Sequence, residues 1–336
     1  MTVLAPLTEK LRARSDLDSA DVALAGTRLL DAAAPLDERA DFLRALHQKG
    51  ESPAEIAEFL RLFLKESLHP DLGPGLLDVC GTGGDKAGLF NVSTAVMFAA
   101  AAGGARVVKQ GNRGVTSKSG GADVLESLGV RLDLPPAESL AATGCAFLFA
   151  QRYHPAFKAV APVRAVLGAE GTPTIFNIIG PLLNPATPDY QLAGVFSETL
   201  LPTYAEVFRL LGRKRAWVAH GHGGLDEVST LGPTEILAVE NGVIGRLTVD
   251  PAALGLAPAQ LDDLRGGTPA ENAVLLEDLL AGKLPGPKSD IVALNTACAL
   301  VVSGTFDELP AALEKAQSVL ANGQAHQVLT RLRQLG

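Results

Sequence analysis

Residues 77–85 read LDVCGTGGD, and residues 91–94 read NVST. An apolar run stops at three glycines and a carboxylate, and a helix of small residues is expected to begin a few positions later. Such a turn leaves backbone N–H groups unpaired beside a helix N-terminus, where phosphate binds well. The segment is neither a P-loop nor a dinucleotide-binding fingerprint, because no Lys-Ser/Thr follows and the third glycine is out of place. It predicts a phosphate site in an α/β fold, and a purely structural turn is the alternative.

The composition is globular and excludes several classes of protein. The chain has 336 residues, of which 47% are hydrophobic and 20% charged, and its net charge is −8. No run of Lys and Arg is dense enough to be a footprint for nucleic acid. The three cysteines lie far apart, which indicates a reducing compartment. Because the N-terminus is charged and no apolar stretch could span a membrane, we expect a cytoplasmic protein.

The periodicity of the apolar residues predicts two domains. Residues 1–72 are helical in pattern, with Ser52, Pro53 and Glu55 forming a helix start that precedes an apolar stripe from Ile56 to Phe63. Residues 154–167 and 175–183 are again helical, and we expect residues 154–186 to return to this domain. Residues 73–153 and 187–336 would then form a large α/β domain. The helical stripes must pack on the rest of the chain or on a second copy of it.

The α/β domain alternates short apolar strands with helices, which is typical of a mostly parallel sheet covered on both faces. A hairpin with a type I′ turn is expected at Asn241-Gly242, and residues 289–302 read as a buried helix. Strands are expected at 76–80, 105–109, 147–149, 191–196 and 216–220, and helices at 93–102, 119–128 and 204–211.

A second polar loop follows the second strand. Residues 109–121 read KQGNRGVTSKSGG, with three cations and several hydroxyl and amide groups before a helix. Loops after adjacent parallel strands face one crevice, so together with the glycine loop they predict a site for two phosphate groups. Asn91 and Ser93 are also good helix caps, which is the alternative to ligand binding. The Ser93 hydroxyl could in addition ligate Mg²⁺.

Acidic and basic residues further along the chain add to this site. Asp226 and Glu227 would repel phosphate unless a divalent cation intervened, so they predict a Mg²⁺ site. His220 and His222 have HxH spacing but no third metal ligand. Arg164 suits capture of a carboxylate, and a surface ion pair is the equal alternative.

Several motifs together resemble anthranilate phosphoribosyltransferase. They are GTGGD at 81–85, NVST at 91–94, KxGNR at 109–113, SKSGGADVLESLGV at 117–130, HPAFKAVAPVR at 154–164, TIFNIIGPLLNP at 174–185 and GLDEVSTLGPT at 224–234. The resemblance implies a helical domain joined to a large α/β domain, and a homodimer through the helical domain. It also implies transfer of the phosphoribosyl group of phosphoribosyl pyrophosphate to the amine of anthranilate, in tryptophan biosynthesis, with Mg²⁺ as cofactor.

The resemblance also implies roles for individual residues. Phosphoribosyl pyrophosphate would be held by Gly81, Gly84, Asp85, Asn91, Ser93, Thr94, Lys109, Asn112 and residues from Ser117 through Ser119 to Gly121. Mg²⁺ would be held by Ser93, Asp226 and Glu227, and anthranilate would meet Gly81, Asn112 and Arg164. The same substrate site would include Leu89, Val92, Gln110, Gly111, Arg113, Thr116 and His154. No catalytic residue is implied, because positioning and electrostatics carry the reaction, with Lys109 and Arg164 in support.

Two positions depart from the family pattern. Lys86 stands where a small residue is usual, and Gln110 replaces the His of KHGNR, which faces the acceptor. Gln cannot become cationic. The substitution therefore bears on the identity of the acceptor more than on the phosphoribosyl chemistry. The alternatives are a related phosphoribosyltransferase or phosphorylase with another aromatic acceptor, and a non-catalytic relative that binds nucleic acid.

Overall fold

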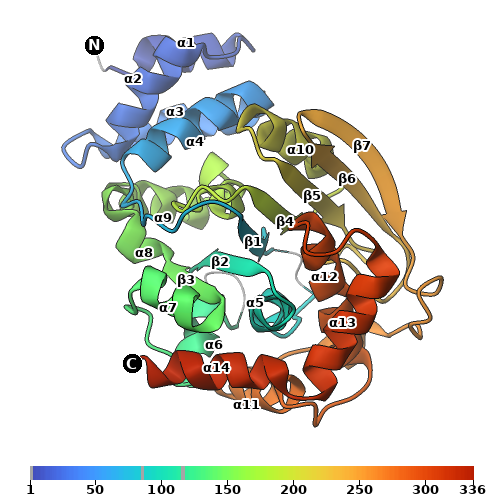
Figure 1. Cartoon of the computed structure of the whole chain (residues 1–336). Helices are drawn as coiled ribbons and strands as arrows, with labels where there is room; N and C mark the ends of the chain where they lie inside the picture. The colour runs from blue at the N-terminus through green and yellow to red at the C-terminus, as the bar shows by residue number, and fades with distance from the viewer. Residues whose placement is uncertain (1–2, 85–86, 115–117) are drawn as a thin grey trace. The chain divides into compact units, whose positions relative to one another are not determined.

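The chain forms two compact units, each built from two separate stretches of sequence. The computed structural model describes residues 3–84, 87–114 and 118–336. One unit comprises Met1–His69 and Gln151–Pro185, and the other comprises Pro70–Ala150 and Ala186–Gly336. The expected fold class, a helical N-terminal region plus a large α/β domain with a mostly parallel sheet, is confirmed (Figure 1).

The first unit begins with four helices. These are α1 (Ala5–Arg12), α2 (Ser19–Leu30), α3 (Leu36–Lys49) and α4 (Pro53–Lys65). The predicted start of α4 is confirmed, because the Glu55 N–H donates to the Ser52 hydroxyl and the Ser52 N–H donates to the Glu55 carboxylate. The apolar stripe from Ile56 to Phe63 is buried.

The segment that returns to this unit is less helical than its sequence predicts. It contains α8 (Ala150–Tyr153), the 3₁₀ turns η1 (Pro155–Ala159), η2 (Ile175–Asn177) and η3 (Gly180–Leu182), and α9 (Ala161–Ala169). The helices expected at 154–167 and 175–183 are therefore wrong as continuous elements. In a continuous helix Pro162 and Pro181 could not donate a backbone hydrogen bond, and their rings would collide with the carbonyl four residues earlier, so each stands in the first turn of a short element instead. Phe63 of α4 packs against Phe157 and Phe176, with ring centroids 5.2 and 5.6 Å apart, which ties this segment to the N-terminal helices.

The second unit is organised by a seven-stranded sheet in the order β3-β2-β1-β4-β5-β6-β7. The strands are β1 (Leu76–Gly81), β2 (Arg106–Gly111), β3 (Cys145–Phe149), β4 (Tyr190–Gly194), β5 (Arg215–His220), β6 (Thr234–Glu240) and β7 (Val243–Val249). Strands β1 to β5 pair in parallel, whereas β6 and β7 are antiparallel. The expected hairpin turn is confirmed, because Asn241 and Gly242 both have positive φ, 49° and 81°.

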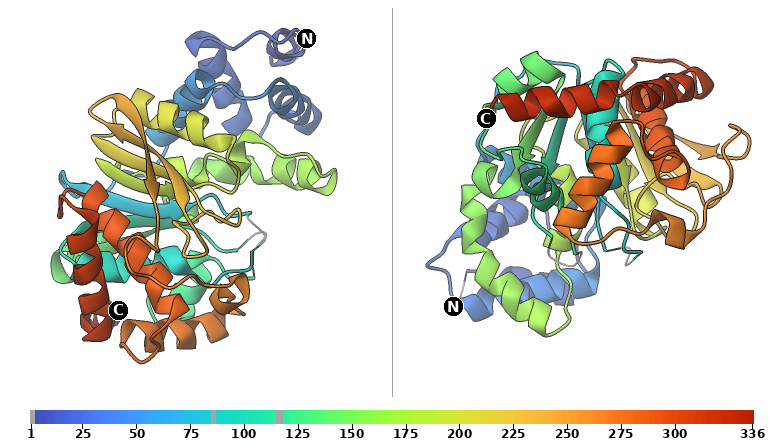
Figure 2. Two further views of the ribbon diagram at one scale, coloured as in Figure 1. Left: turned by 90° about the vertical axis from the view of Figure 1, so that its right-hand side faces the viewer. Right: turned by 90° about the horizontal axis from the view of Figure 1, so that it is seen from below.

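Helices cover both faces of this sheet (Figure 2). Its helical elements are α5 (Val92–Ala102), α6 (Gly121–Ser127), α7 (Pro136–Thr143), α10 (Leu200–Leu210), η4 (Leu261–Leu264), α11 (Pro269–Leu280), α12 (Pro287–Val302), α13 (Leu309–Ala321) and α14 (Gln324–Gln334). Helices α5 and α12 pack on the central strands, whereas α10 packs on β5 to β7. Right-handed crossovers that leave β1 in one direction and β4 in the other place α5 and α10 on opposite faces. As expected, α12 is buried from Ile291 to Val302.

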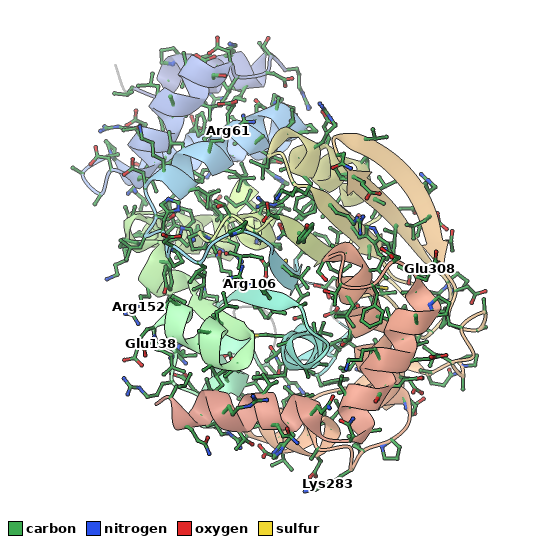
Figure 3. The ribbon with its side chains drawn as sticks, in the orientation of Figure 1. Arg61, Arg106, Glu138, Arg152, Lys283 and Glu308 are labelled. Atoms are coloured by element: carbon green, nitrogen blue, oxygen red, sulfur yellow. The ribbon has the colours of Figure 1, made fainter. Side chains whose placement is uncertain are left out.

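Many charged side chains lie on the surface. Lys283 and Glu308, for example, extend from the outside of the α/β unit (Figure 3). Among the described residues, no helix is both long and apolar enough to cross a membrane.

Candidate functional site

The candidate site lies where the strand order changes direction. The chain runs from β1 outward to β2 and β3, and then crosses back to place β4 on the other side of β1. At this switch point the connections that follow β1 and β4 run in opposite directions along the sheet, and open α/β sheets bind ligands outside the strand ends at such a point. Gly81 at the end of β1 pairs with Gly194 at the end of β4.

The segment containing Asp226 packs against both of these strand ends. One carboxylate oxygen of Asp226 accepts a hydrogen bond of 2.5 Å from the N–H of Gly83, 143 positions away in the sequence. A Cβ atom on Gly81 would lie 2.5 Å from that oxygen, and one on Gly194 would lie 1.7 Å from the Asp226 carbonyl oxygen. Only glycine at both positions lets the Asp226-Glu227 segment, called the acidic segment below, approach the glycine loop that begins at Gly81.

Gly194 and Gly221 are parts of this site that the sequence analysis missed. A Cβ atom on Gly221 would lie 2.3 Å from the carbonyl oxygen of Glu227, so this glycine also makes room for the acidic segment. The available signal was a glycine at or just after the end of a strand, which is common and therefore weak.

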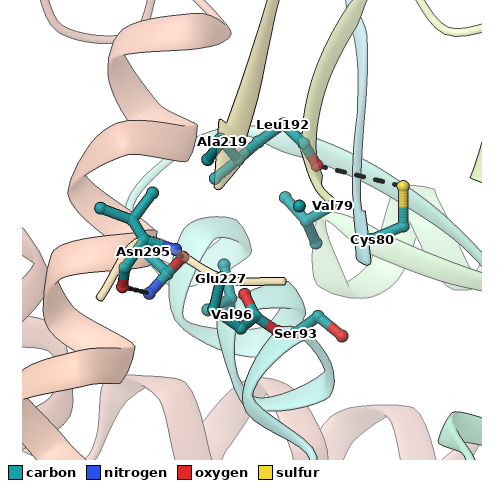
Figure 4. Close-up of a pocket in the computed structure, with 10 residues that line it drawn as sticks. Val79, Cys80, Ser93, Val96, Leu192, Ala219, Glu227 and Asn295 are labelled. Atoms are coloured by element: carbon teal, nitrogen blue, oxygen red, sulfur yellow. Dashed lines mark hydrogen bonds between the residues drawn. The ribbon is translucent and has the colours of Figure 1, made fainter. Parts of the chain in front are cut away.

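Ser93 and Glu227 lie close together (Figure 4), and Lys109 bonds to Ser93. Ser93 at the start of α5 and Glu227 line one small cavity, together with Cys80 from β1 and Asn295 from α12. The Lys109 ammonium is buried and donates to the Val79 carbonyl at 2.6 Å and to the Ser93 hydroxyl at 3.1 Å. One cation therefore links β1, β2 and α5.

The second polar loop is tied to the first through Asn91. Its side-chain amide donates to the Ser119 carbonyl at 3.1 Å, and the Ser119 hydroxyl donates to the Asn91 side-chain oxygen at 3.0 Å. Asn91 occupies the N-cap position of α5 without a side-chain capping bond, so the capping alternative is wrong for this side chain. The two loops are neighbours, as their positions after adjacent strands predicted.

Internal bonds shape the second loop. The Asp123 carboxylate accepts from the N–H groups of Gly114 and Gly120 at 2.8 and 2.9 Å. Although partial burial raises the pKa of Asp123, these bonds and Arg113 outweigh it and lower the pKa overall. Arg113 also pairs with Glu126 and lies over the Phe149 ring, 5.5 Å from its centroid. The Arg113 guanidinium therefore stabilises the second loop. A contact between Arg113 and substrate stays a prediction.

The other predicted residues of the α/β unit fall into three groups. Gly84 and Asn112 are exposed, and Leu89, Gln110, Gly111 and Gly121 are half-buried. Val92 belongs to the hydrophobic core, and the Thr94 hydroxyl is buried without a hydrogen-bond partner among the described residues. Asp85, Thr116 and Ser117, with Lys86, lie outside the described residues.

His154 and Arg164 belong to the helical unit. His154 is 3% exposed, stacks on Phe157 and bonds through Nε2 to the Leu183 carbonyl at 2.9 Å. A carbonyl only accepts, so Nε2 carries the hydrogen and Nδ1 is a bare lone pair. Burial lowers the pKa of His154 to about 4, so the ring is neutral at pH 7.

Arg164 is exposed and lies over the Phe176 ring, 5.8 Å from its centroid. Across residues 3–84, 87–114 and 118–336, no carboxylate lies within ion-pair distance of it. The surface ion pair that was the alternative for Arg164 is therefore not formed in this part of the chain.

The donor set fits Mg²⁺ when substrate supplies further oxygens. Asp226, Glu227 and Ser93 offer oxygen ligands only, and Mg²⁺ typically takes one or two carboxylates plus phosphates and waters. Within the described ranges, no three His, Cys, Asp or Glu residues are grouped closely enough to hold a metal ion by themselves.

Comparison with known proteins places this arrangement in a family. Residues 73–326 match the family described as "Glycosyl transferase family, a/b domain", so the chain is a glycosyl transferase of this α/β class. The anthranilate phosphoribosyltransferase of Rhodospirillum rubrum is 42% identical over 319 residues, covering 94% of this chain and 91% of the relative. That of Phenylobacterium zucineum is 45% identical over 293 residues, covering 86% of each. The chain belongs to the anthranilate phosphoribosyltransferase family, and the resemblance seen in its sequence is confirmed.

Solved structures agree with this assignment. Anthranilate phosphoribosyltransferase from Thermus thermophilus superposes with a TM-score of 0.90 at 39% identity, covering 98% of each chain. The enzyme from Saccharomyces cerevisiae, in complex with PRPP and Mg, superposes with a TM-score of 0.87 at 28% identity, covering 99% of this chain and 97% of the other.

Gly194→Ala should destabilise the α/β unit by about 1–3 kcal/mol, because the added methyl group collides with the Asp226 main chain. Gly245→Ala on β7 is the matched control, since a Cβ atom there meets nothing within 4 Å. Urea unfolding measures both variants. Equal losses of stability would contradict the close approach of Asp226 to β4.

The stability of the protein should fall as the pH is lowered from 6.5 towards 4. His154 in the unfolded chain binds a proton in this window, whereas the buried ring does not, so the free energy of unfolding decreases with falling pH. The contribution between pH 7.5 and pH 5 is about 2 kcal/mol. Urea unfolding at the two pH values should show a pH dependence smaller by this amount in His154→Gln. An unchanged pH dependence would mean that His154 is not buried in the neutral form.

Proposed function

We propose that this protein transfers the phosphoribosyl group of phosphoribosyl pyrophosphate to the amine of anthranilate, giving N-(5-phosphoribosyl)anthranilate and pyrophosphate. The observation that carries the proposal is the convergence of the glycine loop, the Asp226-Glu227 segment, Ser93 and Lys109 at the β1/β4 switch point. Family membership and the PRPP and Mg complex of the yeast relative support it.

The proposed phosphoribosyl pyrophosphate site is built from the two neighbouring loops. Backbone N–H groups of the glycine loop and of the α5 N-terminus suit phosphate oxygens. The buried Thr94 hydroxyl, on the same helix, has no hydrogen-bond partner in the part of the chain that the structure describes. Ser93, Asp226 and Glu227 would hold Mg²⁺, which when bound neutralises charge on the pyrophosphate leaving group.

The reaction needs no strong general base. The bond from ribose C1 to pyrophosphate oxygen breaks as the anthranilate nitrogen bonds to C1, and the amine then loses a proton to solvent. An aromatic amine is neutral and nucleophilic at pH 7, so alignment of the two substrates supplies much of the acceleration. Lys109 adds a fixed positive charge that compensates the charge developing on the leaving group.

The acceptor contacts are the least constrained part of the proposal. Gln110 on β2 has a buried side-chain oxygen with no hydrogen-bond partner among the described residues, which is consistent with a polar partner on a ligand. Arg164 has no competing carboxylate in the described ranges and is proposed to bind the anthranilate carboxylate. The 4-fluoroanthranilate complex of the yeast relative favours an aminobenzoate over another aromatic acceptor.

The homodimer through the helical domain, the cytoplasmic location and the absence of nucleic-acid and membrane partners stay predictions. Sedimentation analysis of the purified chain measures the first of them directly.

Turnover is tested by mixing the protein with phosphoribosyl pyrophosphate, Mg²⁺ and anthranilate and following the loss of anthranilate fluorescence. Glu227→Gln should raise the Mg²⁺ concentration for half-maximal rate by about 10–100-fold, because a ligand charge is lost. The exposed Glu308→Gln is the control and should match the wild type. A wild type that releases pyrophosphate only with another amine would overturn the proposed acceptor, and an unchanged Mg²⁺ requirement in Glu227→Gln would overturn the metal assignment.

Gln110→His should keep kcat within about threefold and change mainly the KM for anthranilate, because the substitution restores a ring where the acceptor is proposed to lie. Steady-state kinetics with each substrate varied in turn separates the two parameters. A collapse of kcat with an unchanged KM for anthranilate would place Gln110 in the chemistry instead.

A further inference from the structure

Helices α11 and α12 each carry one deeply buried asparagine, and neither belongs to a motif that the proposed function uses. Asn272 lies in the first turn of α11 and Asn295 lies in the middle of α12, and each is 1% exposed. An asparagine is seldom buried so completely unless its amide has specific partners. In both cases the partners are loops of the candidate site.

Asn272 bonds to the junction of the two phosphate loops. Its side-chain N–H donates to the Asn91 side-chain oxygen at 2.9 Å, and that oxygen is the same acceptor that the Ser119 hydroxyl uses. The Asn272 side-chain oxygen accepts from the Gly267 N–H at 2.7 Å, so its own orientation is set by the backbone. A continuous chain of bonds therefore runs from Gly267 through Asn272 and Asn91 to Ser119.

Close packing holds the origin of this chain in place. A Cβ atom on Gly266 would lie 2.5 Å from the Cα of Phe90 and 2.8 Å from the Asn272 side-chain oxygen. The Gly266 N–H also donates to the Gly88 carbonyl at 2.9 Å. The segment before α11 is thus packed closely against the residues that lead into α5. The bond from Asn272 to Asn91 therefore fixes Asn91 relative to this segment.

Asn295 bonds to the acidic segment in a different way. Its side-chain oxygen accepts from the Val228 N–H at 2.9 Å, and its side-chain N–H donates to the Val228 carbonyl at 2.8 Å and to the Ile291 carbonyl at 2.9 Å. Both backbone groups of the residue after Glu227 are satisfied by one amide. Asn295 also lines the cavity shared by Ser93 and Glu227.

We propose that Asn272 and Asn295 are positioning residues with divided tasks: Asn272 sets the two phosphate loops for phosphoribosyl pyrophosphate, and Asn295 sets the acidic segment for the divalent cation. This inference rests on the proposed function of the site. Neither residue touches substrate, and each acts through the loop residues to which it bonds.

Asn272→Asp and Asn295→Asp are the sharpest variants, because they are almost isosteric. Each aspartate keeps the oxygen that accepts from Gly267 or Val228 and replaces the donating N–H by an oxygen that faces another acceptor. The bond to Asn91, or the bonds to the Val228 and Ile291 carbonyls, are lost, and the new carboxylate repels the oxygen that it faces. The folded cores are otherwise unchanged in volume.

The two variants should fail in different parameters. Asn272→Asp should weaken binding of phosphoribosyl pyrophosphate about tenfold or more by calorimetry at saturating Mg²⁺, with the metal requirement unchanged. Asn295→Asp should raise the concentration of Mn²⁺ needed for half-saturation, followed by electron paramagnetic resonance with phosphoribosyl pyrophosphate present, by about 10–100-fold. Each variant is the matched control for the other.

Several outcomes would overturn the proposal. Equal changes of both parameters in both variants, with lower thermal midpoints, would assign the asparagines a purely structural role. If either aspartate variant does not fold, Asn272→Ser and Asn295→Ser are measured instead. Each should change the same binding parameter as the corresponding aspartate variant, by about threefold, since no repelling charge is introduced. A wild type that binds phosphoribosyl pyrophosphate but does not consume anthranilate would overturn the proposed function only. The separate tasks of Asn272 and Asn295 are measured by binding and do not depend on turnover.

Discussion

The packing of the Asp226 main chain against two glycines is the constraint on which the rest of the site depends. Gly81 and Gly194 end neighbouring parallel strands, and the missing Cβ atoms leave the space that the acidic segment fills. The Gly83 N–H donates to the Asp226 carboxylate, so the glycine loop is held by a carboxylate of the protein itself. Without this approach the elements proposed to bind phosphate and metal would be separate features of the fold.

A buried cation, Lys109, lies on the strand next to this contact. Two adjacent carboxylates are brought to the proposed phosphate site, and the buried Lys109 ammonium bonds to Ser93. A buried charge is stable only with such partners. The net charge of −8 is therefore compatible with the proposed binding of a polyanion at this one place. Helices α11 and α12, far along the chain, hold the loops that carry these groups.

Much of the fold could be predicted from local pattern. The strands β1, β2 and β5, the start of α4 and the hairpin turn at Asn241-Gly242 follow from apolar periodicity, capping residues and turn chemistry, which act within a few residues. The returning segment was predicted less well, because Pro162 and Pro181 divide helical patterns into short 3₁₀ turns and one helix. The capping alternative for Asn91 failed for a tertiary reason, since its side chain bonds to Ser119 and Asn272 instead.

The sequence by itself determined the class of fold, the glycine loop and the residue types suited to phosphate and Mg²⁺, because those signals lie in contiguous motifs. Only the tertiary structure decided which of them meet. Asp226 reaches Gly83 across 143 positions, and Gly194, Gly221, Asn272 and Asn295 acquire roles only through such approaches. Their physical cause is steric and directional: a missing Cβ atom or a buried amide has meaning only beside the particular backbone that it faces.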